Sequence, residues 1–205
     1  MARDTQSIVK MSRREGYALH PKATKYLLKR STVPGQHGRT VRKNTGQYNT
    51  QLREKQKVKR LYGLLEKQFA RLMVEASRTK GQTGAALLQY LEQRMDNAVY
   101  RAGFAVSRRA ARQLVTHGHF CLNGRRVDVP SIRLKPGDEI TVRVQSAASE
   151  YFKKLDEVSP GGNETALSWL AVERKKLYFK VTGVPKREEA EPEIQEQLIV
   201  EYYSR

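Results

Sequence analysis

The sequence predicts an α+β protein, with helices in its first half followed by a small antiparallel sheet. Apolar residues three or four positions apart indicate helices between residues 50 and 103. Short apolar segments separated by Asn-Gly and Pro-Gly pairs indicate antiparallel strands after residue 119. The segment before residue 47 has few apolar residues, so it is expected to be a basic, irregular arm.

Positive charge dominates the composition. The 205 residues include 39 Lys and Arg against 21 Asp and Glu, a net charge of +18. Residues 1–60 carry +13, residues 61–143 carry +7 and residues 144–205 carry −2. Such a charge indicates a polyanionic partner rather than a merely soluble basic protein, and the uneven distribution places that partner against the first two thirds of the chain.

Several classes of protein are not expected. The single cysteine excludes an internal disulfide, and the first residues have no apolar region of the kind found in secretory signals. No apolar run approaches the roughly 18 residues that span a bilayer. We therefore expect a cytosolic protein that does not bind membranes.

The predicted arm covers residues 1–46. Its stretch "VPGQHGRTVRKNTG" combines turn-forming glycines with basic residues. "PGQHG" is interpreted as a tight turn in preference to a phosphate-binding loop. Basic arms of this composition often become ordered only on nucleic acid.

Two long helices are expected next, packed as a hairpin. The first runs from a cap at Thr50 to Gly81 and the second ends at Gly103. The first half of the first helix bears cations around most of its circumference, which indicates that a polyanion surrounds it. These cations are Arg53, Lys55, Lys57, Lys59 and Arg60.

A shorter helix is expected between Ser107, as its N-cap, and Gly118, as its stop. At 100° per residue, Arg108, Arg109 and Arg112 fall within an arc of about 100°. Apolar residues occupy the opposite side. The three arginines are therefore expected to point outwards together.

A β-hairpin follows this helix. Asn123-Gly124 separates two apolar segments and favours a two-residue turn, because both residues tolerate positive φ. Arg125 and Arg126 leave that turn, beside the arginine-bearing helix. A Pro-Gly turn at 136–137 then leads into an alternating strand that ends at Val144.

The remaining segments are mixed. Residues 159–164 are expected to form a loop, and two short strands are expected around Lys175-Lys176. A final helix is expected to begin at Pro192.

The chemistry-bearing residues do not indicate catalysis or metal binding. His117, His119 and Cys121 alternate as metal ligands on a strand could, but Gly118 interrupts the alternation and the other histidines are distant. We expect Cys121 to be a small core residue and the histidines to border an RNA-facing surface. Asp96, next to arginines on a helix, is interpreted as a structural ion pair, and no catalytic motif is present.

The arginines therefore carry the functional prediction. Arg108, Arg109 and Arg112 on a helix, with Arg125 and Arg126 on the adjacent hairpin, would form a groove for a phosphate backbone. Reading base edges in DNA would require Asn, Gln or Ser beside them, and Gln113 alone is available.

The stretch "SRRAARQLVTHGHFCLNGRRVDVPSIRLKPGDEITV" resembles the S4 RNA-binding domain, which pseudouridine synthases and a tRNA synthetase also carry. "LREKQKVKRLYGLLEKQF", "RMDNAVYRAGF", "PGQHG" and "LIVEYYSR" further resemble the bacterial-type small-subunit ribosomal protein S4 family, over roughly residues 34–205. The first 33 residues depart from the family. Some members bind zinc there through clustered cysteines, which this stretch lacks, so no metal is expected.

The resemblance implies an architecture. An N-terminal extension covers 1–46, and a helical domain covers 47–93 and is completed by a C-terminal helix at 188–205. The S4 RNA-binding domain, with a small antiparallel sheet, is inserted between them at 94–187.

The resemblance also implies a function. The chain would be a non-enzymatic constituent of the small ribosomal subunit, without cofactors, that binds the 5′ domain of 16S rRNA early in assembly. It would contact ribosomal protein S5 and influence decoding accuracy. Arg39, Arg42 and Lys43 would line the channel by which mRNA enters the subunit. It would not be a homo-oligomer, and it would act in the cytoplasm or in an organellar ribosome.

Two other classes remain as alternatives. An RNA-modifying enzyme would need a catalytic domain of well over a hundred residues, and about sixty follow the RNA-binding module. A stress-related RNA-binding module would be shorter and would lack the segment 34–93.

Overall fold

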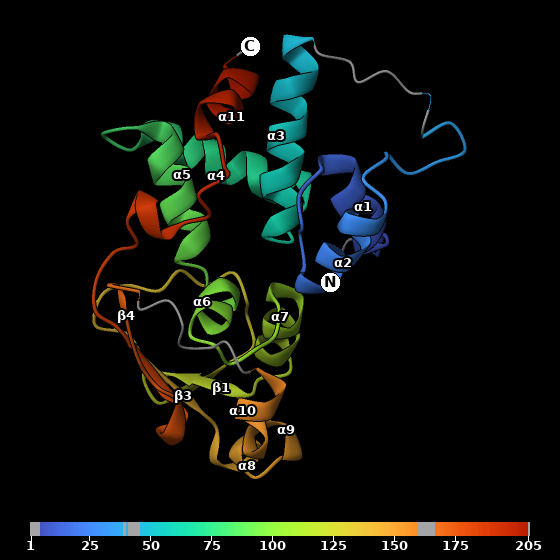
Figure 1. Ribbon diagram of the computed structural model, residues 1–205. Coiled ribbons are helices and arrows are strands. Elements are labelled where there is room, and N and C mark those ends of the chain that lie inside the picture. Colours follow the sequence, from blue (N-terminus) through green and yellow to red (C-terminus); the bar gives the residue numbers. More distant parts are fainter. Residues whose placement is uncertain (1–4, 39, 41–45, 160–166, 205) are drawn as a thin grey trace. The chain divides into compact units, whose positions relative to one another are not determined.

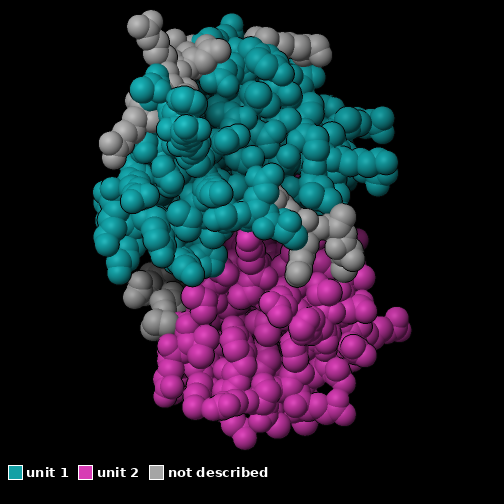
Figure 2. Space-filling view, turned by 90° about the vertical axis from the view of Figure 1, so that its right-hand side faces the viewer, with its two compact units in different colours: residues 1–87, 193–205 teal, residues 88–192 magenta. Residues whose placement is uncertain are grey.

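The computed structural model describes residues 5–38, 40, 46–159 and 167–204. The described residues of 1–87 and 193–205 form one compact unit, and those of 88–192 form a second (Figure 2). The first unit thus joins the C-terminal helix to the N-terminal helices. This unit also includes the described part of residues 1–46, and the division into domains given above stays a prediction.

The first unit is built of helices in its described part. They are α1 (Ile8–Glu15), α2 (Pro21–Lys29), α3 (Gln47–Leu61), α4 (Glu66–Arg78), the first part of α5 (Thr83–Glu92) and α11 (Glu196–Tyr203). α11 lies beside α3 (Figure 1). Gln51 Nε2 donates to Glu201 Oε2 at 2.7 Å, and the rings of Tyr48 and Tyr202 are 5.7 Å apart.

The prediction of an irregular arm is wrong for residues 8–29, which form α1 and α2. Met11, Leu19 and Ala23 are buried, so these two short helices do contribute to the core. The Ser12 hydroxyl accepts from the Leu19 backbone N–H at 3.3 Å, which ties the link between the helices back to α1. Apolar residues in this segment are few but well placed, and composition alone did not reveal this.

The single helix expected from Thr50 to Gly81 is two helices. α3 begins at Gln47, and Gly63 breaks the run with φ = +65°, a conformation that glycine adopts without strain. The break lets Leu64 enter the core, where it is 3% exposed. α4 then starts in a new direction and buries Phe69 and Leu72.

The second expected helix is also broken. α5 ends at Glu92 and α6 (Met95–Arg101) begins three residues later. Between them, Leu134 N–H donates to Gln93 C=O at 2.9 Å and Met95 N–H donates to Ile132 C=O at 2.8 Å. A distant segment thus takes the hydrogen bonds that a continuous helix would have formed internally.

The second unit combines helices with a five-stranded antiparallel sheet, in the order β2-β1-β3-β5-β4. This confirms the predicted α+β class. The strands are β1 (Phe120–Leu122), β2 (Arg125–Val127), β3 (Glu139–Val142), β4 (Leu170–Glu173) and β5 (Tyr178–Val181). The longer helix is α7 (Arg108–Thr116), and the short ones are α8 (Val144–Ala147), α9 (Glu150–Lys153), α10 (Leu155–Val158), η1 (Arg174–Lys176) and η2 (Arg187–Glu189).

The core of the second unit is aromatic. Phe104, Phe120, Phe179 and Trp169 are at most 1% exposed. The ring of Phe104 lies 6.2 Å from that of Phe120 and 5.6 Å from that of Phe179. These rings fix α6, α7 and the sheet as one body, and so fix the surface that α7 and the β1–β2 hairpin share.

Two boundaries differ slightly from expectation. The strand expected to reach Val144 ends at Val142, because Val144 begins α8 and is exposed. The final helix begins at Glu196 instead of Pro192, although Ile194 before it is already buried.

Candidate nucleic-acid interface

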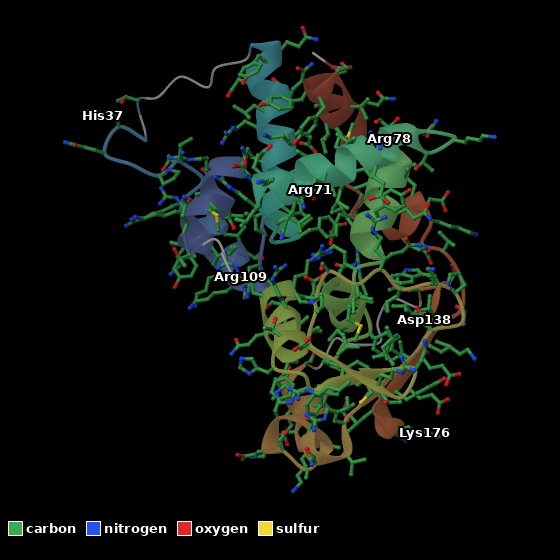
Figure 3. The ribbon with its side chains drawn as sticks, turned by 180° about the vertical axis from the view of Figure 1, so that it is seen from behind. His37, Arg71, Arg78, Arg109, Asp138 and Lys176 are labelled. Atoms are coloured by element: carbon green, nitrogen blue, oxygen red, sulfur yellow. The ribbon has the colours of Figure 1, made fainter. Side chains whose placement is uncertain are left out.

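The start of α7 is set by its cap, as expected. The Ser107 side chain accepts from the Ala110 backbone N–H at 3.2 Å. Ala111 and Val115 are buried, so the opposite side of the helix faces outwards. Arg109 is on that side and is exposed (Figure 3).

The expectation that all three α7 arginines point outwards is wrong for Arg108. Its Nε donates to Asn97 Oδ1 and its Nη2 to Glu191 Oε1, both at 2.8 Å. Its guanidinium carbon also lies 4.7 Å from the centre of the Tyr100 ring. Arg108 therefore joins α7 to α6 and to the end of the second unit.

Arg112 is likewise engaged inside the unit. Its Nη1 donates to Asp96 Oδ2 at 3.1 Å. Asp96 is 4% exposed and also accepts from the Nε and Nη2 of Arg94 at 3.1 and 3.0 Å. The contacts fit the interpretation of Asp96 as a structural ion pair.

The β1–β2 hairpin has the expected turn. Asn123 and Gly124 have φ values of +49° and +78°. The Asn123 side chain accepts from Glu139 N–H and donates to Asp138 Oδ1, both at 2.9 Å. The turn is thus fixed to the start of β3, and Arg125 and Arg126 follow it on an edge strand.

Arg125 and Arg126 are exposed, as is Arg109 on α7, and we refer to these three residues as the arginine surface. In the described part of the chain, no carboxylate lies within ion-pair distance of these three guanidinium groups. The arginine surface is therefore smaller than the predicted set of five, but its positive charge is not neutralised by the protein.

The hairpin meets the C-terminal end of α7 at Gly118, which has φ = +71°. A Cβ atom on Gly118 would stand 2.5 Å from Arg126 Nε, so the Arg126 side chain lies against this glycine. Arg143 Nη1 donates to Gly118 C=O at 3.3 Å. Two guanidinium groups thus gather at a helix C-terminus, where cations are favoured.

Sequence reasoning missed Arg143. Its one indication in the sequence was its place between Val142 and Val144, on the polar side of the alternating strand. Arg143 N–H donates to His119 C=O at 2.9 Å, which brings it to the end of α7.

The two histidines border this end of α7. Their ring centres are 6.0 Å apart, and His119 Nδ1 lies 3.0 Å from Ser146 Oγ. Burial, the neighbouring His117 and Arg143 all lower the pKa of His119 from its ordinary value of 6.5. The His119 imidazole is therefore neutral at pH 7.5.

The metal question raised by the spacing of His117, His119 and Cys121 can be examined in the described residues. Among them, no group of three or more His, Cys, Asp or Glu side chains is arranged to hold a metal ion. Cys121 is half-buried on β1 rather than a core residue.

In the first unit, acidic side chains already pair with the cations of α3. Glu15 on α1 accepts from Arg53 Nη1 at 3.2 Å and from Arg60 Nη1. The Glu15 side chain is fully buried, and burial raises its pKa in spite of the two arginines. Glu15 therefore fastens α1 to α3.

The lysines of α3 have similar partners. Lys55 and Lys59 bind the two carboxylate oxygens of Glu66 at 2.6 and 3.0 Å, and Lys57 binds Glu54 at 2.8 Å. Lys55 is 4% exposed. The polyanion expected around this helix is thus partly the protein's own carboxylates, and a role of these cations in rRNA binding stays a prediction.

The three residues predicted to line the mRNA channel, Arg39, Arg42 and Lys43, lie outside the described residues. None of the helices in the described ranges is long and apolar enough to cross a membrane.

Comparison with known proteins identifies the family. The model described as "Ribosomal protein S4/S9 N-terminal domain" matches residues 3–92, and the model of the "S4 domain" matches residues 93–140. Small ribosomal subunit protein uS4 of Herpetosiphon aurantiacus is 50% identical over 211 residues, with both chains covered completely. The uS4 proteins of Chloroflexus aurantiacus and Clostridioides difficile are each 48% identical, again over both full lengths.

The chain belongs to the uS4 family. It is thus a ribosomal protein with an S4 domain and not an enzyme. The matched range begins at residue 3, so the resemblance also includes the first 33 residues, which sequence analysis had set apart.

Proposed function

We propose that this uS4 chain is a structural constituent of the small ribosomal subunit that binds 16S rRNA. The observation that carries the proposal is the arginine surface, where Arg109, Arg125 and Arg126 are exposed and lack a carboxylate partner among the described residues. Planar guanidinium groups fit phosphate oxygens with two parallel hydrogen bonds. An RNA backbone supplies such oxygens in series.

This surface is suited to the shape of RNA more than to its base sequence. In the hairpin turn, the Asn123 side chain is already bonded to Glu139 N–H and Asp138 Oδ1. The exposed amide that could contact a base edge is then Gln113, on α7. Contacts to phosphate fix position and orientation but carry no direct sequence information. We infer that the protein recognises the rRNA sequence indirectly, through the three-dimensional fold that this sequence gives the RNA.

The support for the more specific roles is the resemblance to the family. The chain would bind the 5′ domain early in assembly, contact ribosomal protein S5 and influence decoding accuracy. The α3 cations Arg53, Lys55, Lys57, Lys59 and Arg60 would add rRNA contacts where rRNA phosphates can compete with Glu15, Glu54 and Glu66. The protein would act as a single copy within the subunit.

A salt titration tests the proposed rRNA surface. Arg125→Gln with Arg126→Gln should weaken binding to a 16S rRNA 5′-domain transcript and lower the salt slope by about 0.7–0.9 for each lost phosphate contact. Lys175→Gln with Lys176→Gln is the matched control, because it removes equal charge from the weakly charged C-terminal third. An unchanged slope in the arginine variant, or a larger effect in the lysine variant, would refute the surface.

Copurification separates the ribosomal function from the other RNA-binding classes. The chain should remain on small subunits through a high-salt wash. A chain that is released completely, and that instead modifies free RNA, would overturn the proposal.

The mRNA channel needs a separate measurement. Alanine at Arg39, Arg42 and Lys43 should leave rRNA affinity within about one decade, since phosphate contacts elsewhere dominate. Translation through structured messages should slow. Collapse of rRNA binding with normal translation of such messages would show that these residues anchor the protein instead.

A further inference from the structure

The outer face of α4 bears a row of cations. Lys67, Arg71 and Arg78 are all exposed. At 100° and 1.5 Å per residue they fall within an arc of about 40° and extend over about 16 Å. Val74 lies among them and is 53% exposed. We name these four residues the α4 stripe.

The orientation of the stripe is fixed by the core. Phe69, Leu72, Met73 and Ala76 are at most 8% exposed and hold the opposite side of α4. The helix therefore cannot rotate without exposing these side chains. Arg71 and Arg78 lie about two turns apart along this helix (Figure 3).

The cations of the stripe differ from those of α3. Within the described ranges, no carboxylate is at ion-pair distance from Lys67, Arg71 or Arg78. The acid at the start of α4, Glu66, is instead bonded to Lys55, Lys59 and the Tyr203 hydroxyl. The unit thus neutralises one cationic helix and leaves the stripe charged.

Two of these cations lie at positions that oppose helix stability, whereas Arg78 lies in the last turn of α4, where cations are favoured. Lys67 lies in the first turn of α4, where the positive end of the helix dipole disfavours cations. Arg71 follows it at i+4, and like charges at this spacing repel. Among the described residues, Lys67 and Arg71 have no ion pair that offsets these costs, so the arrangement favours an external anion.

We propose that the α4 stripe is a second RNA-binding site, at which Lys67, Arg71 and Arg78 contact consecutive phosphates of a 16S rRNA strand. It rests on the proposed function but lies on different residues from the arginine surface. A row of three cations fits a polyphosphate backbone, with Val74 against a sugar. Protein interfaces have apolar or aromatic centres, and here Val74 is the single apolar member of the stripe.

The test is a salt titration with a 16S rRNA 5′-domain transcript. Glutamine at Lys67, Arg71 and Arg78 should lower the salt slope by about 2, since each lost phosphate contact removes about 0.7–0.9. Glutamine at Lys153, Lys175 and Lys176 removes the same charge from exposed positions in the second unit and should leave the slope nearly unchanged. An equal effect of both triple variants, or an unchanged slope in the α4 variant, overturns the inference.

The variant Arg125→Gln with Arg126→Gln separates this inference from the proposed function. If it weakens binding while the α4 variant does not, the stripe is refuted and the proposed function stands. If neither weakens binding, the arginine surface is refuted together with the stripe.

A second measurement does not depend on the folding of the triple variant. Val74→Cys, in a Cys121→Ser background, can carry a tethered iron chelate that cuts nearby RNA by hydroxyl radicals. Localised cuts in the bound transcript support the stripe. A complex that forms normally but is not cut overturns it.

Discussion

The guanidinium group of Arg126 lies against the backbone of Gly118, at the junction of the hairpin and the C-terminal end of α7. A Cβ atom at Gly118 would be 2.5 Å from Arg126 Nε and 2.8 Å from Nη2. The glycine therefore serves two purposes. It adopts φ = +71° to end the helix, and it leaves room for the arginine.

Gly118→Ala should accordingly weaken both stability and rRNA binding. An L-residue in the left-handed region costs about 1–2 kcal/mol, and the new methyl group must displace Arg126. Gly124→Ala is a matched control, because Gly124 has φ = +78° but nothing within 4 Å of its added Cβ. Thermal unfolding should shift similarly in both variants, and rRNA affinity should fall further in Gly118→Ala. Equal affinities would show that Arg126 is free to move without loss.

Arg109 and Arg112 should respond differently to the same substitution. Arg109→Gln removes an exposed charge, so rRNA affinity should fall while the free energy of unfolding changes by less than about 0.5 kcal/mol. Arg112→Gln removes one guanidinium partner of buried Asp96 and should cost about 1–3 kcal/mol. Urea unfolding and rRNA titration of both variants test this. The assignment is wrong if Arg109→Gln destabilises more than Arg112→Gln.

Asp96 should be the most sensitive side chain of the α6–α7 contact. Asp96→Ala leaves Arg94, which is 5% exposed, without its carboxylate, and breaking such a buried pair costs about 3–5 kcal/mol. Asp128 is exposed, so Asp128→Ala should change stability by less than about 0.5 kcal/mol. Chemical unfolding followed by circular dichroism distinguishes them. A loss below about 1 kcal/mol for Asp96→Ala would show that water solvates Arg94.

Local sequence predicted the parts of the fold that short-range chemistry determines. The Ser107 cap, the Asn123-Gly124 turn and the antiparallel sheet are all present. The breaks at Gly63 and after Glu92 were not predicted, because apolar periodicity continues across both. Those breaks depend on burial of Leu64 and on hydrogen bonds to Ile132 and Leu134, which are tertiary contacts.

The candidate site shows the same limit. Helical geometry correctly grouped Arg108 and Arg112, but it could not reveal that Glu191 and Asp96 would neutralise them. Glu191 is 83 positions from Arg108 in the sequence. Glu15 likewise reaches Arg53 and Arg60 across 38 and 45 positions. Counting charges along a helix therefore does not show which cations have carboxylate partners within the protein. Arg109, Arg125 and Arg126 have none among the described residues, and the role of all five arginines in rRNA binding stays a prediction.

The last prediction concerns pH. Burial, His117 and Arg143 lower the pKa of His119 below 6.5 in the free protein. The unfolded chain therefore takes up a proton more readily than the folded one, so His119 costs the free protein stability as pH falls through 6.5. A nearby rRNA phosphate would act in the opposite direction, because it would favour the imidazolium and raise the pKa of His119 in the complex.

The complex should thus bind more protons than the free protein, and rRNA affinity should rise severalfold from pH 8 to pH 6. His119→Gln should flatten this dependence. Arg125→Gln should lower affinity about equally at both pH values, because a guanidinium does not titrate there. Filter binding of the 16S rRNA 5′-domain transcript at fixed salt measures all three proteins. An identical pH dependence in wild type and His119→Gln would mean that no rRNA phosphate approaches the imidazole.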